Sequence, residues 1–190
     1  KVSRNIILGK AAFQDNRHLL TSPSIPRPAR IVSYHSLVSS RFLYHLGTLP
    51  SLPPTLFIRL NSVYCEFWHA IYGNTLNRIK IEGHRLTTKA LFIKFSILPF
   101  SFVLRKLRIA QFIRIVRFGT PLLLAIISLT LSSPTSWIPT VISDFAWLRN
   151  NSTKLDSLGS PSDSLSPWID QVKRYPGLFL LLVDNIHKSN

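Results

Sequence analysis

The chain has 190 residues, of which 23 are Lys or Arg and 8 are Asp or Glu, and its formal net charge is +15. Apolar residues make up 46% and aromatic residues 11%, which excludes a disordered polycation because such chains are poor in both. Only 16% of the residues are charged, whereas a soluble globular domain usually has about a quarter. This composition favours a basic protein that touches a membrane or a large polyanion.

The positive charge is concentrated in the first part of the chain. Residues 1–117 hold 18 of the 23 cations and three acids, whereas residues 118–190 hold five of each. This asymmetry favours contact of the first part with a polyanion or with the anionic face of a membrane. The alternative is a basic, solvated surface that has no fixed partner.

Residues 1–60 are rich in Arg and Ser and contain one acid, a composition that resembles an organellar transit peptide. This resemblance favours a mitochondrial or other organellar location. Because proline breaks helices, we expect an irregular region with short helices over residues 2–20, 31–46 and 56–61. The prolines that carry this expectation are Pro23, Pro26, Pro28, Pro50, Pro53 and Pro54.

Residues 61–117 form a basic, aromatic-rich segment that we expect to be helical. Apolar side chains recur at helix-face spacing over residues 61–72, which predicts an amphipathic helix. Its aromatic residues favour a place in the core over stacking on single-stranded nucleic acid beside nearby cations. They are Tyr64, Phe67, Trp68 and Tyr72.

A metal site has weak support in the same segment. Cys65 and His69 are four residues apart on the expected helix, and His84 is the nearest further ligand. Zinc sites generally need four ligands, so we expect a buried thiol beside a histidine and no bound metal. The sequence indicates no cofactor.

Residues 118–143 carry no charge and are the candidate membrane segment. Within them, residues 121–142 would form a helix about 33 Å long, enough for the roughly 30 Å hydrocarbon core. Pro134 and Pro139 argue against an unbroken span, so an interfacial helix is a second expectation. Two further alternatives are a hairpin of residues 90–104 and 118–132, and a core helix that is covered by partner proteins.

Five cations directly precede this segment, and we expect them to contact anionic lipid or another polyanion. By the positive-inside rule, we expect the residues before the segment to lie on the cytosolic side or its topological equivalent. The expected contact residues are Arg105, Lys106, Arg108, Arg114 and Arg117.

Residues 144–190 are expected to form a flexible polar linker and a short apolar element. Residues 156–161 and 163–167 form a small repeat with Ser and Pro, which is typical of a linker. Asn150 and Asn151 both open glycosylation sequons, and residues 178–183 are expected to be a packed strand or a helix turn.

The sequence lacks the phosphate-binding, nucleophile and metalloprotease motifs of common enzymes. We therefore expect a mainly α, non-catalytic, membrane-associated accessory or scaffold subunit of a larger complex. The alternative is an RNA-binding or ribosome-associated protein. Because the chain begins with Lys1 and contains no Met, a third interpretation is a fragment or an unselected translation without a defined function.

Overall fold

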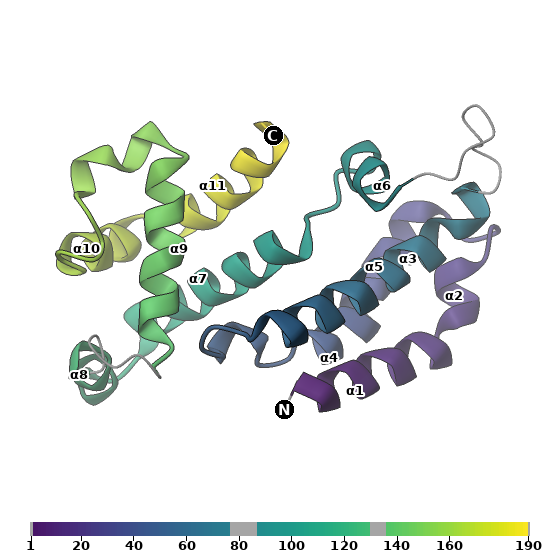
Figure 1. The fold of residues 1–190 in the computed structure, drawn as a ribbon, viewed down its shortest axis with the longest axis horizontal. Coiled ribbons are helices and arrows are strands. Elements are labelled where there is room, and N and C mark those ends of the chain that lie inside the picture. The colour runs from purple at the N-terminus through teal and green to yellow at the C-terminus, as the bar shows by residue number, and fades with distance from the viewer. Residues whose placement is uncertain (1, 77–86, 130–135, 190) are drawn as a thin grey trace. The chain divides into compact units, whose positions relative to one another are not determined.

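The computed structural model describes residues 2–76, 87–129 and 136–189 (Figure 1). Helix makes up 79% of the structure and the described ranges contain no strand, which confirms the mainly α class. The chain divides into two compact units. Unit 1 comprises Lys1–Tyr44 and Leu52–Phe100, and unit 2 comprises His45–Ser51 and Ser101–Asn190. This division differs from the expected four segments, which end at residues 60, 117 and 143.

Unit 1 is built on one long helix, α5, against which α1, α2 and α6 all pack. Helix α3 continues through the π-helical turn η1 into α4, and α1 also contacts η1 and α4. In chain order the elements are α1 (Val2–Asp15), α2 (Arg17–Thr21), α3 (Arg27–Ser33), η1 (Tyr34–Ser39), α4 (Ser40–Phe42), α5 (Pro54–Leu76) and α6 (Thr88–Lys94).

The short helices expected over residues 2–20, 31–46 and 56–61 largely coincide with α1 and α2, with α3 to α4, and with the start of α5. The expectation that prolines keep the chain irregular between them is wrong where helices begin at those prolines. Pro26 is the residue before α3, Pro28 lies in its first turn, and Pro54 is the first residue of α5. The first turn of a helix tolerates proline, since a backbone N–H there has no acceptor within the helix. These prolines therefore begin helices instead of breaking them.

Aromatic side chains fill the core of unit 1. The ring of Phe13 stacks on Phe67 with centroids 4.9 Å apart, and Tyr34 lies 4.7 Å from Trp68. Phe42 meets Phe67 edge to face at 5.5 Å. The predicted helix over residues 61–72 and its burial in the core are both confirmed, although α5 begins earlier, at Pro54.

In unit 2, helix α7 packs its apolar side against the helices of the C-terminal region. Phe145 on α9 lies 5.3 Å from Phe112 on α7 and 5.1 Å from Trp168 on α10, between ring centroids. The elements are η2 (Leu46–Thr48), α7 (Phe100–Phe118), α8 (Pro121–Leu129), α9 (Ile138–Asn150), η3 (Thr153–Leu158), α10 (Ser166–Arg174) and α11 (Pro176–Ser189).

The short segment His45–Ser51 belongs to unit 2 through contacts at Gly47. A Cβ atom at Gly47 would lie 2.8 Å from the carbonyl oxygen of Leu107, so the close approach requires glycine. The indole Nε1 of Trp137 donates a hydrogen bond to the carbonyl of Gly47 at 2.6 Å.

The expected flexible linker over residues 144–190 is wrong. Leu148, Leu155, Leu165 and Trp168 are buried in the core of unit 2, and Pro167 lies in the first turn of α10. Residues 178–183, expected to be a packed strand or a helix turn, lie within helix α11, in agreement with the helical alternative. The polar repeat hid this pattern, because its Ser, Gly and Pro residues lie between apolar residues such as Leu155 and Leu165 that point into the core.

The expected 22-residue helix over residues 121–142 also needs correction. Helix α8 covers Pro121–Leu129, a separate helix begins at Ile138 with Pro139 in its first turn, and residues 130–135 lie outside the described part. In the described ranges, no helix is at once long enough and apolar enough to cross a membrane.

Candidate anionic-membrane interface

The five predicted contact residues all lie on helix α7, but the structure divides them into two groups. Arg105, Lys106 and Arg108 form ion pairs with acids of the same unit. Arg114 and Arg117 are exposed at the end of α7 that leads to α8. We call the first three the paired cations and the last two the exposed cations.

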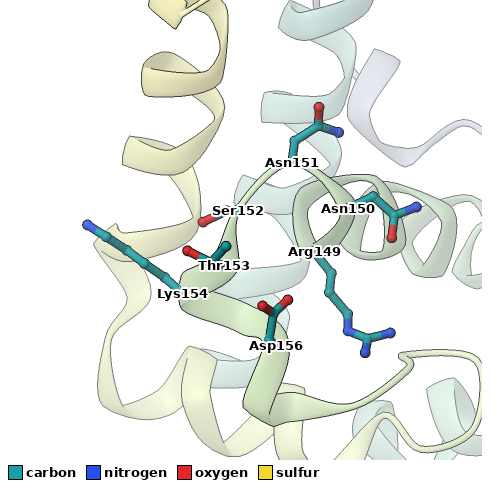
Figure 2. Close-up of a pocket in the computed structure, with 7 residues that line it drawn as sticks. All are labelled: Arg149, Asn150, Asn151, Ser152, Thr153, Lys154 and Asp156. Atoms are coloured by element: carbon teal, nitrogen blue, oxygen red, sulfur yellow. The ribbon is translucent and has the colours of Figure 1, made fainter.

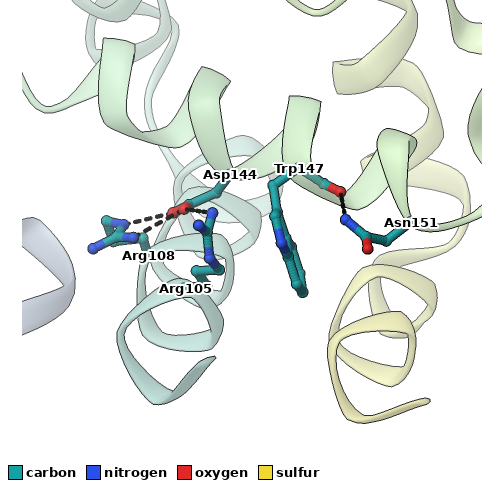
Figure 3. A network of polar contacts seen from close by, with 5 residues as sticks. All are labelled: Arg105, Arg108, Asp144, Trp147 and Asn151. Carbon is teal, nitrogen blue, oxygen red and sulfur yellow. Dashed lines mark hydrogen bonds and ion pairs between the residues drawn. The ribbon is translucent and has the colours of Figure 1, made fainter. Parts of the chain in front are cut away.

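Asp144 on α9 holds two of the paired cations (Figure 3). Arg105 Nη1 donates to Asp144 Oδ1 at 2.8 Å, and Arg108 donates through Nε to Oδ2 and through Nη2 to Oδ1 at 2.9 Å. Asp144 is only 1% exposed, so this carboxylate depends on its two arginines for charge compensation. These arginines therefore connect α7 to α9 and are not available to an external partner in this arrangement.

The guanidinium of Arg105 also makes a cation–π contact with Trp147. Its Cζ atom lies 4.6 Å from the centroid of the Trp147 ring. Both side chains are labelled in Figure 3. Burial lowers the pKa of Arg105, and the negative charge of Asp144 opposes that change. Asn151 donates to the backbone carbonyl of Trp147 at 2.8 Å, close to the end of α9.

Lys106 is paired less tightly than the two arginines. Its Nζ lies 2.7 Å from both carboxylate oxygens of Asp184 on α11. The two side chains are 35% and 33% exposed, so water reaches both partners.

The exposed cations adjoin an uncovered apolar surface. Phe118, Leu122 and Ile126 are 74%, 71% and 47% exposed, and the last two lie four residues apart on α8. The guanidinium of Arg117 lies over the ring of Phe118, with Cζ 5.0 Å from its centroid. Within the described ranges neither Arg114 nor Arg117 forms an ion pair. Cationic and apolar groups are therefore presented together, as at the boundary between lipid headgroups and acyl chains.

A polar groove of about 660 Å³ lies at the end of α9 (Figure 2). Its lining comes from residues 149–154 and Asp156 and includes both sequon residues, Asn150 and Asn151, which are exposed. The groove offers amides, hydroxyls and charges of both signs. They come from Arg149, Asn150, Asn151, Ser152, Thr153, Lys154 and Asp156.

The residues considered for a metal have other neighbours. His69 Nε2 lies 3.0 Å from Thr88 Oγ1, and Cys65 Sγ lies 3.9 Å from Asn61 Oδ1. Burial raises the pKa of the Cys65 thiol. His84 lies outside the described residues, and within the described ranges no three His, Cys, Asp or Glu side chains gather around one point.

Sequence reasoning missed Asp144 and Asp184 as partners of the cluster. The available signal was the spacing of Asp144, three residues after Val141 and four before Leu148 on the apolar side of a helix, where a buried acid requires a cation. Comparison with protein-family models, curated proteins and solved structures finds no match to this chain.

Proposed function

We propose that this chain is a non-catalytic accessory or scaffold protein that docks on an anionic membrane surface. In this proposal α8 lies in the interface as an apolar anchor, with the cations supplied by the end of α7, and is not a span. The observation that carries it is that α8, which exposes Leu122 and Ile126, follows directly on the end of α7 that exposes Arg114 and Arg117.

The apolar surface of α8 distinguishes a membrane from other polyanions. Contact with phosphates alone would use the cations and leave Leu122 and Ile126 in water. An interfacial helix buries its apolar side among acyl chains while its cations meet the headgroups. A cluster of exposed apolar side chains beside cations fits this environment better than it fits an RNA surface, which is polar and charged.

The expected organellar location has only compositional support. Phe13, Tyr34 and Phe42, which lie in the segment that resembles a transit peptide, are buried in the core of unit 1. These side chains therefore contribute to the fold. We accordingly propose the class of surface, an anionic leaflet, and base no step on the identity of the organelle.

Sedimentation with vesicles tests the proposal. The full chain should bind vesicles that contain anionic lipid, and the double variant Leu122→Ser/Ile126→Ser should bind more weakly. The serines lose the free energy that Leu122 and Ile126 would gain by burying their exposed surface in lipid. Because each side chain is only partly exposed in the free protein, we expect this loss to be about 2 kcal/mol for the pair, or roughly 30-fold in affinity.

The matched control is Ile58→Ser/Ile93→Ser, which removes two exposed isoleucines from unit 1. We expect it to bind vesicles as the parent does. Equal binding by the parent and both variants would refute docking through α8. If the α8 variant also kept a strongly salt-dependent affinity for RNA, the RNA-binding alternative would replace the proposal.

A further inference from the structure

Arg30 on α3 is a buried cation in unit 1. The residue is 5% exposed, and its Nη1 donates to the carbonyl of Ile71 at 2.9 Å. Its Nε is buried and has no hydrogen-bond partner in the described ranges. A buried guanidinium without a counter-charge is strongly unfavourable, so this position favours an anion beside it.

Arg27 brings a second guanidinium to the same region. It precedes Arg30 by three residues on α3, and its Cζ lies 4.8 Å from the ring of Phe95 and 5.6 Å from the ring of Tyr72. Those two rings stack with centroids 4.1 Å apart. Arg30 reaches the same place through the carbonyl of Ile71, the residue that precedes Tyr72. Burial raises the pKa of Tyr72, and the positive charges of Arg27 and Arg30 oppose that change.

The described acids of unit 1 do not neutralise these arginines. Glu66 pairs with Lys10 at 3.1 Å, and Asp15 is exposed on α1 without an ion pair to either arginine. Glu82 lies outside the described residues. The groups gathered around Tyr72 are therefore cations and hydrogen-bond donors, the combination that recognises an oxyanion.

We propose that Arg27 and Arg30, together with the hydroxyl of Tyr72, bind a phosphate group. Arg27 is exposed and gives the ligand access from the surface, while the buried Arg30 supplies the fixed charge. The planar edge of a guanidinium matches the spacing of phosphate oxygens. The site lies in unit 1 and involves no residue of α8, so a failed test of membrane docking through α8 would not refute it.

Calorimetric titration of the full chain with inorganic phosphate, at constant ionic strength, tests the site. We expect Arg27→Gln to weaken phosphate binding at least tenfold. The matched control is Arg59→Gln, an exposed arginine on α5 of the same unit, and it should change affinity less than twofold. Absence of phosphate binding by the parent, or equal loss in both variants, would overturn the proposal.

The variant Arg30→Lys tests whether phosphate binding needs the guanidinium of Arg30 or only its positive charge. Lysine keeps the charge but lacks Nε and the planar pair of donors, so we expect a loss of phosphate affinity comparable to that of Arg27→Gln. Unchanged affinity in a folded Arg30→Lys protein would remove Arg30 from the site and overturn the two-arginine arrangement. Should that variant not fold, the comparison of Arg27→Gln with Arg59→Gln still decides.

Vesicles distinguish the two sources of a phosphate group. Phosphatidic acid presents a phosphate monoester, and phosphatidylserine vesicles of equal surface charge provide the comparison. Preference for phosphatidic acid that Arg27→Gln abolishes, with competition by inorganic phosphate, would assign a lipid headgroup. Phosphate binding without that preference would assign free phosphate, and absence of both would refute the site.

Discussion

The basic cluster on α7 consists of the five cations from Arg105 to Arg117, and its two ends have different surroundings. Arg105 and Arg108 share the buried carboxylate of Asp144, whereas Arg114 and Arg117 are exposed beside α8. A count of cations treats the two ends alike. The structure shows that a cation is available to an external anion only where the fold has not already supplied one.

This difference changes the expected strength of membrane attraction. A cation held near an anionic leaflet contributes about 1 kcal/mol, so five independent cations would contribute about 5 kcal/mol. With three of the five paired internally, we expect the exposed cations alone to contribute about 2 kcal/mol to the proposed binding. The remainder of any strong binding must then come from the apolar side of α8.

The largest expected effect tests the paired end. Asp144→Asn removes the carboxylate that compensates Arg105 and Arg108, and losing one partner of a buried pair costs about 3 kcal/mol. The melting temperature of the 190-residue chain should fall by roughly 10 °C. Thermal unfolding followed by circular dichroism measures this, and Asp163→Asn, at an exposed acid of the same unit, is the control.

A melting temperature of Asp144→Asn within 1–2 °C of the control would contradict the assignment (roughly 0.5 kcal/mol, the usual size of a surface substitution). It would mean that the two arginines are not held by Asp144 and remain available to partners. The paired and exposed ends would then be equivalent, and the comparison between them would fail.

The second effect compares the two ends directly through vesicle affinity. Arg114→Gln/Arg117→Gln should weaken binding to anionic vesicles by about 2 kcal/mol, roughly 30-fold, and leave the melting temperature unchanged. Arg105→Gln/Arg108→Gln should lower the melting temperature, because it leaves Asp144 buried without a counter-charge. We expect it to leave vesicle affinity unchanged. Equal loss of vesicle binding in both variants would show that all of the cluster meets the membrane.

Much of the fold could be predicted wherever apolar spacing was regular. The aromatic face of residues 61–72 gave a correct helix in the core, because each of those side chains recurs with the period of a helix. Prolines misled the prediction at residues 1–60, since a proline that begins a helix and one that ends it look alike in sequence. Pro28 and Pro54 begin helices because the residues after them pack into the core of unit 1, and that packing is not visible from the prolines themselves.

The division of the candidate site could not be predicted, for a different reason. Arg108 and Asp144 are 36 residues apart, and Lys106 and Asp184 are 78 apart. Spacing within a helix predicts contacts between residues three or four positions apart, and contacts at these separations depend on how α7, α9 and α11 pack. The clustering of cations was visible in the sequence, but their neutralisation was not.

The smallest expected effect concerns Lys106, which is intermediate between the two ends. Its pair with Asp184 is about one-third exposed on both sides, and pairs of this kind contribute at most about 1 kcal/mol to stability. Asp184→Asn should therefore leave the melting temperature nearly unchanged while it releases Lys106. A released cation near an anionic leaflet adds about 1 kcal/mol, so vesicle affinity should rise roughly fivefold. Asp163→Asn makes the same change of net charge without releasing a paired lysine, and its smaller gain is the reference. An equal gain in both variants would mean that Lys106 stays out of reach of the membrane, and the membrane-facing cations would then be Arg114 and Arg117 alone.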